Sequence, residues 1–283
     1  MNLSKPFALL IFSIAMAVAC LLSACGGGND FPPVVTGVKV QSAQYGKTAT
    51  IYLGGKDLRS NLKVDTSGAC TNPTFASNSN SNTDTLVLNC LVTKTGDLSL
   101  VVQTAEGVAV YSTTLNVPLP QVALITGKGS MTLELDPTLA PISTNNFLSY
   151  VNKGFYRGTL FHRVIPSFVI QGGGYATGMI KKADQSAPIQ LESNKGLSNV
   201  RGSLAMARTY VPNSATSEFY INLVDNLSLD YKNAANPGYA VFGKVVQGMD
   251  VADAIAAEPR GVVGVFSDVP LVEIALSLAL QTQ

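Results

Sequence analysis

The chain has 283 residues, of which 46% are hydrophobic and only 13% carry a charge. Its 19 basic and 18 acidic side chains nearly balance, so electrostatics gives no support for nucleic-acid binding. One histidine and four cysteines leave no cluster with the spacing of a zinc site, and we expect neither a metal nor a cofactor. The length is sufficient for two ordinary hydrophobic cores.

The first 25 residues have the pattern of an export signal. Lys5 precedes an apolar run over residues 7–22, which is too short and too early for a membrane-spanning helix. The run ends in Leu22-Ser23-Ala24-Cys25, which resembles the bacterial lipobox and implies cleavage before Cys25 and acylation of that cysteine. Residues 1–24 are therefore predicted to be a lipoprotein signal peptide, and residues 25–33 a lipidated tether. An ordinary secretory signal cut nearby is the alternative.

This signal also predicts a compartment. Gly26, rather than Asp, follows the cysteine, and the resemblance to Gram-negative lipoproteins then implies an outer-membrane anchor in the cell envelope, facing the periplasm. In that oxidising compartment Cys70 and Cys90 are predicted to form a disulfide. The bridge would close a loop of about 20 residues and contribute on the order of 3 kcal/mol in the chain-entropy model.

Residues 34–119 have the pattern of a small β-sandwich. Segments rich in Val, Thr, Ile and Leu are separated by Gly, Asn and Asp turn signals at intervals typical of such a domain. The polar run 76–82 is predicted to be a surface loop. We expect an immunoglobulin-like arrangement, ending at Pro118 and Pro120, with strands over residues 34–40, 48–53, 85–92, 98–103 and 108–117.

Residues 120–283 are predicted to form a second domain. It begins with a hairpin over residues 121–126 and 130–135. A helix over residues 144–153 follows, because Thr144, Leu148 and Val151 recur at helical spacing and Gly154 can terminate the helix. A second helix is expected around residues 249–257 and a last strand over residues 271–280.

The run from Phe161 to Gly174 combines a fixed cation, a carboxamide and large apolar side chains in a chain that is poor in charge. It contains Arg163, Phe168 and Gln171. Side chains alternate along a strand, so His162, the only histidine, is expected to point away from Arg163 and to belong to the core. Pro166 turns the chain, so Phe168 and Gln171 need not follow this alternation.

This run resembles the motif of the cyclophilin-type peptidyl-prolyl isomerases. Three further segments resemble that family in its order, over residues 202–209, 214–222 and 238–246, and the resemblance is strongest to the bacterial periplasmic branch. It covers about residues 121–280. The resemblance implies a mainly β fold for residues 120–283, a closed eight-stranded antiparallel barrel with a helix over each end.

The chemistry of prolyl isomerisation suits these residue types. Twisting the peptide bond before proline crosses a barrier of ~18–20 kcal/mol, and it requires no nucleophile. A catalyst grips the proline ring and donates to an amide nitrogen that becomes hydrogen-bond accepting, for which a permanently charged guanidinium is suited. The resemblance implies catalytic roles for Arg163, Gln171 and Phe168. It implies substrate contacts for Val169, Ala207, Arg208, Thr209, Glu218, Tyr220, Leu229 and Tyr239.

Three positions depart from the family pattern. Glu218 stands where many members have glutamine, Tyr220 where phenylalanine is usual, and Ser228 where tryptophan or phenylalanine is frequent. A carboxylate beside Arg163 is expected to compete with the substrate for the guanidinium donors and to lower turnover. Three other rings are expected in the core, namely Phe155, Phe161 and Phe219.

The predicted activity is isomerisation of Xaa-Pro bonds in exported polypeptides, by a monomer. Two alternatives belong to other classes of protein. One is a proline-peptide-binding holdase chaperone with weak turnover, which Glu218 favours. The other is a structural lipoprotein with an inert barrel, against which the presence of Arg163, Phe168 and Gln171 argues.

Overall fold

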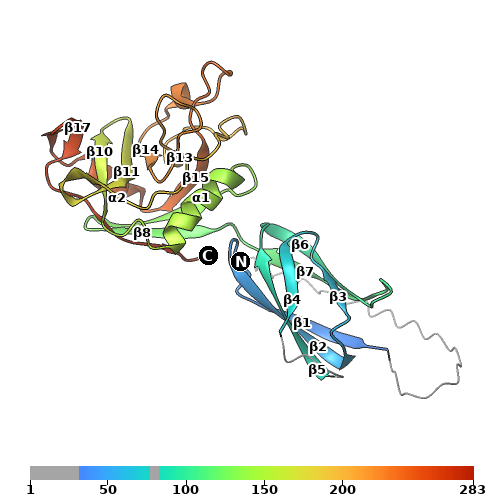
Figure 1. Cartoon of the computed structure of the whole chain (residues 1–283). Helices are drawn as coiled ribbons and strands as arrows, with labels where there is room; N and C mark the ends of the chain where they lie inside the picture. The colour runs from blue at the N-terminus through green and yellow to red at the C-terminus, as the bar shows by residue number, and fades with distance from the viewer. Residues whose placement is uncertain (1–31, 77–82) are drawn as a thin grey trace, which may run out of the picture. The chain divides into compact units, whose positions relative to one another are not determined.

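A computed structural model describes residues 32–76 and 83–283 (Figure 1). The predicted signal peptide, Cys25 with its predicted acylation and most of the polar run 76–82 lie outside these residues. None of the helices in the described ranges is long and apolar enough to cross a membrane. The described chain contains two β-rich parts, over residues 34–117 and 121–281.

The N-terminal part is a sandwich of two antiparallel sheets. One sheet has the strand order β1-β2-β5-β4 and the other the order β3-β6-β7, which is the strand order of the constant-type immunoglobulin fold. In β2, Ala49, Ile51 and Leu53 are buried at every second position, as expected for a strand with one face on a core. The predicted arrangement is therefore confirmed. The strands are β1 (Val34–Gln41), β2 (Thr48–Leu58), β3 (Lys63–Asp65), β4 (Cys70–Phe75), β5 (Thr83–Val92), β6 (Gly96–Gln103) and β7 (Ala109–Val117).

The predicted disulfide between Cys70 and Cys90 is present and joins the neighbouring strands β4 and β5. Strands β3 and β4 were not predicted. β3 has only three residues, too few for an alternation to be visible. β4 contains Pro73, which is tolerated because this strand lies at the edge of its sheet.

The C-terminal part is an antiparallel barrel. Eight strands follow the order β10-β11-β14-β13-β15-β9-β8-β18, and a bridge between Leu160 and Ala275 brings its two ends together. β12 adds to β11 outside this path. The predicted barrel is confirmed. The eight barrel strands are β8 (Gln121–Thr126), β9 (Gly129–Leu135), β10 (Thr159–Ile165), β11 (Val169–Ala176), β13 (Ser203–Met206), β14 (Phe219–Asn222), β15 (Val241–Gln247) and β18 (Leu276–Gln281), and the additional strand is β12 (Ile180–Lys181).

Two α-helices pack on the barrel (Figure 1). α1 (Pro141–Asn152) begins three residues earlier than predicted, at a proline that suits the first turn of a helix. The Glu192 carboxylate accepts hydrogen bonds from two backbone N–H groups of that turn, at 3.2 and 2.5 Å. α2 (Met249–Ala256) buries an apolar face that includes Val251 and Ile255, as predicted.

The barrel core is rich in aromatic rings. Phe147 of α1 lies against Phe219 of β14 with ring centroids 5.3 Å apart, and Phe161 lies 6.1 Å from Phe219. Phe155, Phe161 and Phe219 are all buried, which confirms their assignment to the core. This aromatic core fixes the strands that carry the site described below.

The end of the chain differs from the prediction. The last strand begins at Leu276 rather than at residue 271, and a hairpin of β16 (Arg260–Val263) and β17 (Phe266–Pro270) precedes it. Both Leu271 and Val272 are about 65% exposed, so their hydrophobicity does not indicate burial. A hydrophobic run at an exposed turn gives the same sequence pattern as a buried strand.

Candidate active site

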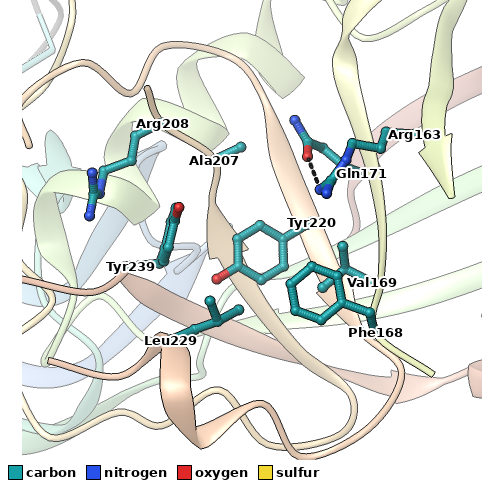
Figure 2. Close-up of a pocket in the computed structure, with 9 residues that line it drawn as sticks. All are labelled: Arg163, Phe168, Val169, Gln171, Ala207, Arg208, Tyr220, Leu229 and Tyr239. Atoms are coloured by element: carbon teal, nitrogen blue, oxygen red, sulfur yellow. Dashed lines mark hydrogen bonds between the residues drawn. The ribbon is translucent and has the colours of Figure 1, made fainter. Parts of the chain in front are cut away.

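Arg163 and Gln171 face each other across two neighbouring strands. Arg163 lies on β10 and is the register partner of Gln171 on β11. The Arg163 Nη1 group donates a hydrogen bond to Gln171 Oε1 over 3.3 Å, and Figure 2 shows this bond as a dashed line. The turn between the strands includes Ser167 at φ 58° and brings Phe168 back beside the cation, with its ring centroid 5.9 Å from Arg163 Cζ.

A cavity of about 180 Å³ opens beside this pair. Its apolar side includes the rings of Phe168 and Tyr220 with the side chain of Val169 (Figure 2). Of the eleven residues predicted as catalytic or substrate-binding, the structure brings nine together around this one cavity. They are Arg163, Phe168, Val169, Gln171, Ala207, Arg208, Tyr220, Leu229 and Tyr239.

Tyr220 adds a hydroxyl to this apolar cavity, and the structure shows where it is bound. The hydroxyl donates to Asn199 Oδ1 over 2.7 Å, and Asn199 in turn donates through Nδ2 to Asp230 over 2.8 Å. Burial raises the pKa of Tyr220, so the hydroxyl keeps its proton and makes this bond. The ring of Tyr220 therefore lines the cavity, while its hydroxyl is hydrogen-bonded to Asn199. The sequence did not predict Asn199 as this partner.

The opposite side of the cavity is formed by Arg208 and Tyr239. The Arg208 Cζ lies 4.5 Å from the centre of the Tyr239 ring, a cation–π contact. Arg208 also donates to the carbonyls of Gly238 and Thr209, over 2.9 and 2.8 Å. With these donors engaged, Arg208 serves as a fixed part of the wall, in contrast to Arg163.

The comparisons with known proteins agree with this geometry. A family model described as "Cyclophilin type peptidyl-prolyl cis-trans isomerase/CLD" matches residues 121–276, a range that contains all nine cavity residues. The chain belongs to this family.

Curated bacterial relatives are named as isomerases. A peptidyl-prolyl cis-trans isomerase of Acinetobacter baylyi is 53% identical over 149 residues, which are 53% of this chain and 78% of that protein. Isomerase A of Dickeya dadantii is 49% identical over 158 residues, 56% of this chain and 82% of its own. Isomerase B of Escherichia coli K12 is 46% identical over 153 residues, 53% of this chain and 93% of its own.

Two predicted site residues of this isomerase lie outside the cavity lining. Thr209 follows the wall residue Arg208, and its hydroxyl bonds to that of Ser214 over 2.8 Å. Glu218 lies behind Gln171, whose Nε2 group donates to Glu218 Oε2 over 2.8 Å. The expected direct competition for the guanidinium is therefore not what the geometry supports. Among the described residues, hydrogen bonds through the Gln171 amide link Glu218 to Arg163.

His162 does not line the cavity, but it lies close to the residues that do. The β10–β11 pairing shifts register between Phe161 and Arg163, which interrupts the side-chain alternation at His162. His162 Nε2 consequently lies 3.3 Å from Glu218 Oε2, the atom that also binds Gln171. The expected burial of His162 is confirmed, since it is 5% exposed.

The Glu218 carboxylate is held in its charged form. Burial by itself raises the pKa of Glu218, but the neighbouring His162 ring, the Gln171 amide and the charge of Lys181 together outweigh it and lower the pKa below the ordinary value of 4.5. Glu218 is thus an ionised acceptor at neutral pH, next to Gln171 and close to Arg163.

Proposed function

We propose that this isomerase acts on Xaa-Pro bonds of exported polypeptides in the bacterial cell envelope, with Arg163 as the donor to the twisted amide. The observation that carries this proposal is the placement of a half-buried guanidinium, oriented by Gln171, beside an apolar cavity. The family membership supports the reaction class. The export signal predicted for residues 1–24 supports the compartment.

The geometry suggests how the barrier is lowered. A proline ring held among Phe168, Tyr220 and Leu229 would stay fixed while the bond before it rotates. Rotation removes the amide resonance and leaves a lone pair on the prolyl nitrogen, which can then accept a hydrogen bond from Arg163. Because this acceptor is strong only in the twisted state, the donor stabilises the transition state more than either planar isomer.

The test is a protease-coupled assay on a short Xaa-Pro peptide. The wild-type protein is expected to accelerate the cis-to-trans change, and an unchanged rate at micromolar protein would contradict the proposal. The same preparation is then tested for suppression of client aggregation. Suppression without acceleration would support the holdase alternative instead.

The envelope location makes a separate prediction. Cys25→Ser should abolish labelling with radioactive fatty acid and leave an unprocessed or soluble form, because each acyl chain contributes ~0.8 kcal/mol per buried CH₂ to membrane binding. Labelling and cell fractionation measure this.

Cys20→Ser is the matched control, since Cys20 lies inside the apolar run and is the poorer lipobox candidate. It should keep both label and membrane association. A Cys25→Ser protein that still fractionates fully with membranes would show that another anchor exists.

A further inference from the structure

Four polar side chains form a continuous series of contacts from the core to the catalytic donor. His162 Nε2 lies 3.3 Å from Glu218 Oε2, Gln171 Nε2 donates to the same oxygen over 2.8 Å, and Arg163 Nη1 donates to Gln171 Oε1 over 3.3 Å. Glu218 thus uses one oxygen for both of its neighbours, whereas Gln171 uses its NH₂ group for Glu218 and its oxygen for Arg163. Gln171 joins the two charged groups, because its amide oxygen accepts from the Arg163 cation and its NH₂ group donates to the Glu218 anion.

The orientation of the Gln171 amide decides whether Arg163 has an acceptor. A side-chain amide carries an acceptor oxygen and a donor NH₂ group, and the two can exchange places by rotation about one bond. The guanidinium offers donors only, so the productive orientation points Oε1 at Arg163. An ionised carboxylate on the other side accepts only, so it requires the NH₂ group. Glutamine at position 218 could offer either group and would impose no such requirement.

We propose that Glu218 and His162 are positioning residues that lock the Gln171 amide in the orientation that presents Oε1 to Arg163. This inference rests on the proposed role of Arg163. It differs from direct competition for the guanidinium, because the Glu218 charge acts on the Gln171 amide and that amide in turn orients Arg163. Glu218 stands where many family members have glutamine, and through this lock its carboxylate supports turnover instead of lowering it.

The neighbouring residues hold His162 and Glu218 in place. His162 is 5% exposed, and its ring lies against Tyr175 with centroids 4.7 Å apart. Its Nδ1 atom is buried with no hydrogen-bond partner among the described residues, so Nε2 is the nitrogen that serves Glu218. Gly174 leaves room for the carboxylate, since a Cβ there would lie 2.6 Å from the Glu218 carboxyl group.

A double-mutant cycle tests whether Glu218 acts through Gln171. Glu218→Gln should lower kcat/KM on a neutral Xaa-Pro peptide roughly three- to tenfold, the effect of one hydrogen bond of typical strength. In a Gln171→Leu background the same change should have less than about a twofold effect, because no amide remains to be oriented. An equal effect in both backgrounds, or a gain of activity in Glu218→Gln alone, would overturn the proposal.

His162 is tested by a conservative and a non-conservative replacement. His162→Gln can place an amide nitrogen near the position of Nε2 and should retain activity within about twofold. His162→Phe keeps a ring against Tyr175 but removes the donor, and it should lose activity as Glu218→Gln does. Thermal melting controls for folding. If His162→Phe is as active as the wild-type protein, His162 has no positioning role.

A spectroscopic readout is independent of turnover. The side-chain NH₂ resonances of Gln171 should be resolved and slow to exchange in the wild-type protein and lose this protection in Glu218→Gln. A protein with this signature and no isomerase activity would contradict the proposed function but support the lock. An active protein whose Gln171 resonances are unchanged by Glu218→Gln would support the function and overturn the lock.

The same resonances should titrate with Glu218. The groups that face this carboxylate are His162 on β10, Gln171 and Tyr175 on β11, and Lys181 on β12. Because the folded-state pKa of Glu218 is lowered, the lock should be complete above pH 4.5 and disappear as the pH falls through that lowered value. The NH₂ resonances should shift in that acidic range in the wild-type protein and stay constant there in Glu218→Gln.

Discussion

Replacing Arg163 by alanine is expected to lower kcat/KM for a short Xaa-Pro peptide by about 10²- to 10³-fold, the range for losing one preorganised donor to a transition state. Arg163 is the residue whose guanidinium faces both Gln171 and the apolar cavity. Arg163→Lys should lose most of the activity as well, because an ammonium group cannot reproduce the planar, multi-donor fork. The protease-coupled assay measures both variants.

Folding should remain near normal in these variants, since Arg163 lies at the edge of a cavity and not inside the aromatic core. Circular dichroism and thermal melting check this. Arg260→Ala is the control for removal of a cation, because Arg260 is exposed on the β16–β17 hairpin. Activity close to that of the wild-type protein in either Arg163 variant would contradict the assignment of this residue.

Gly173→Ala should be strongly destabilising. Gly173 has φ +89°, and a Cβ there would lie 2.8 Å from the carbonyl oxygen of Ser217 and 2.9 Å from the ring of Tyr156. The left-handed backbone costs an alanine about 1–2 kcal/mol and the overpacking about 1–3 kcal/mol. We therefore expect the free energy of unfolding of the barrel to fall by about 2–5 kcal/mol.

Gly154→Ala separates the two contributions to this loss. Gly154 also has a positive φ, +66°, but an added Cβ would meet no atom within 4 Å. It should lose only the backbone contribution of about 1–2 kcal/mol. Urea unfolding monitored by near-ultraviolet circular dichroism compares the variants. Equal losses in both would show that packing against Ser217 and Tyr156 contributes nothing.

Much of the site could be predicted from sequence because its residues come in short runs. Arg163, Phe168 and Gln171 lie within nine positions, and a strand, a turn and a return strand are enough to bring them together. Val169 belongs to the same run, and four further cavity residues come from the other segments that resemble the family, whereas Leu229 lies outside those segments. Five of the seven sandwich strands were predicted for a similar reason, because the residue composition of a strand and the turn residues that flank it are local properties.

Tertiary structure decided the features that depend on pairing between distant segments. The register shift beside His162 cannot be read from its neighbours, yet it turns this ring toward Glu218, which is 56 positions away in the sequence and lies on β14. The partner of the Tyr220 hydroxyl, Asn199, likewise comes from a loop without any motif. These contacts result from how strands and loops pack, and local periodicity carries no information about them.

Sequence by itself therefore determined the barrel, the sandwich, the family resemblance and the residues that line the cavity. It also pointed to Glu218 as an unusual residue, but it assigned that carboxylate to the wrong neighbour. Adjacency in a motif indicates which residues share a site, whereas the direction of each hydrogen bond depends on register and on which groups can only donate or only accept. Only the folded chain shows that the Glu218 carboxylate contacts Gln171 and His162, and through Gln171 bears on Arg163.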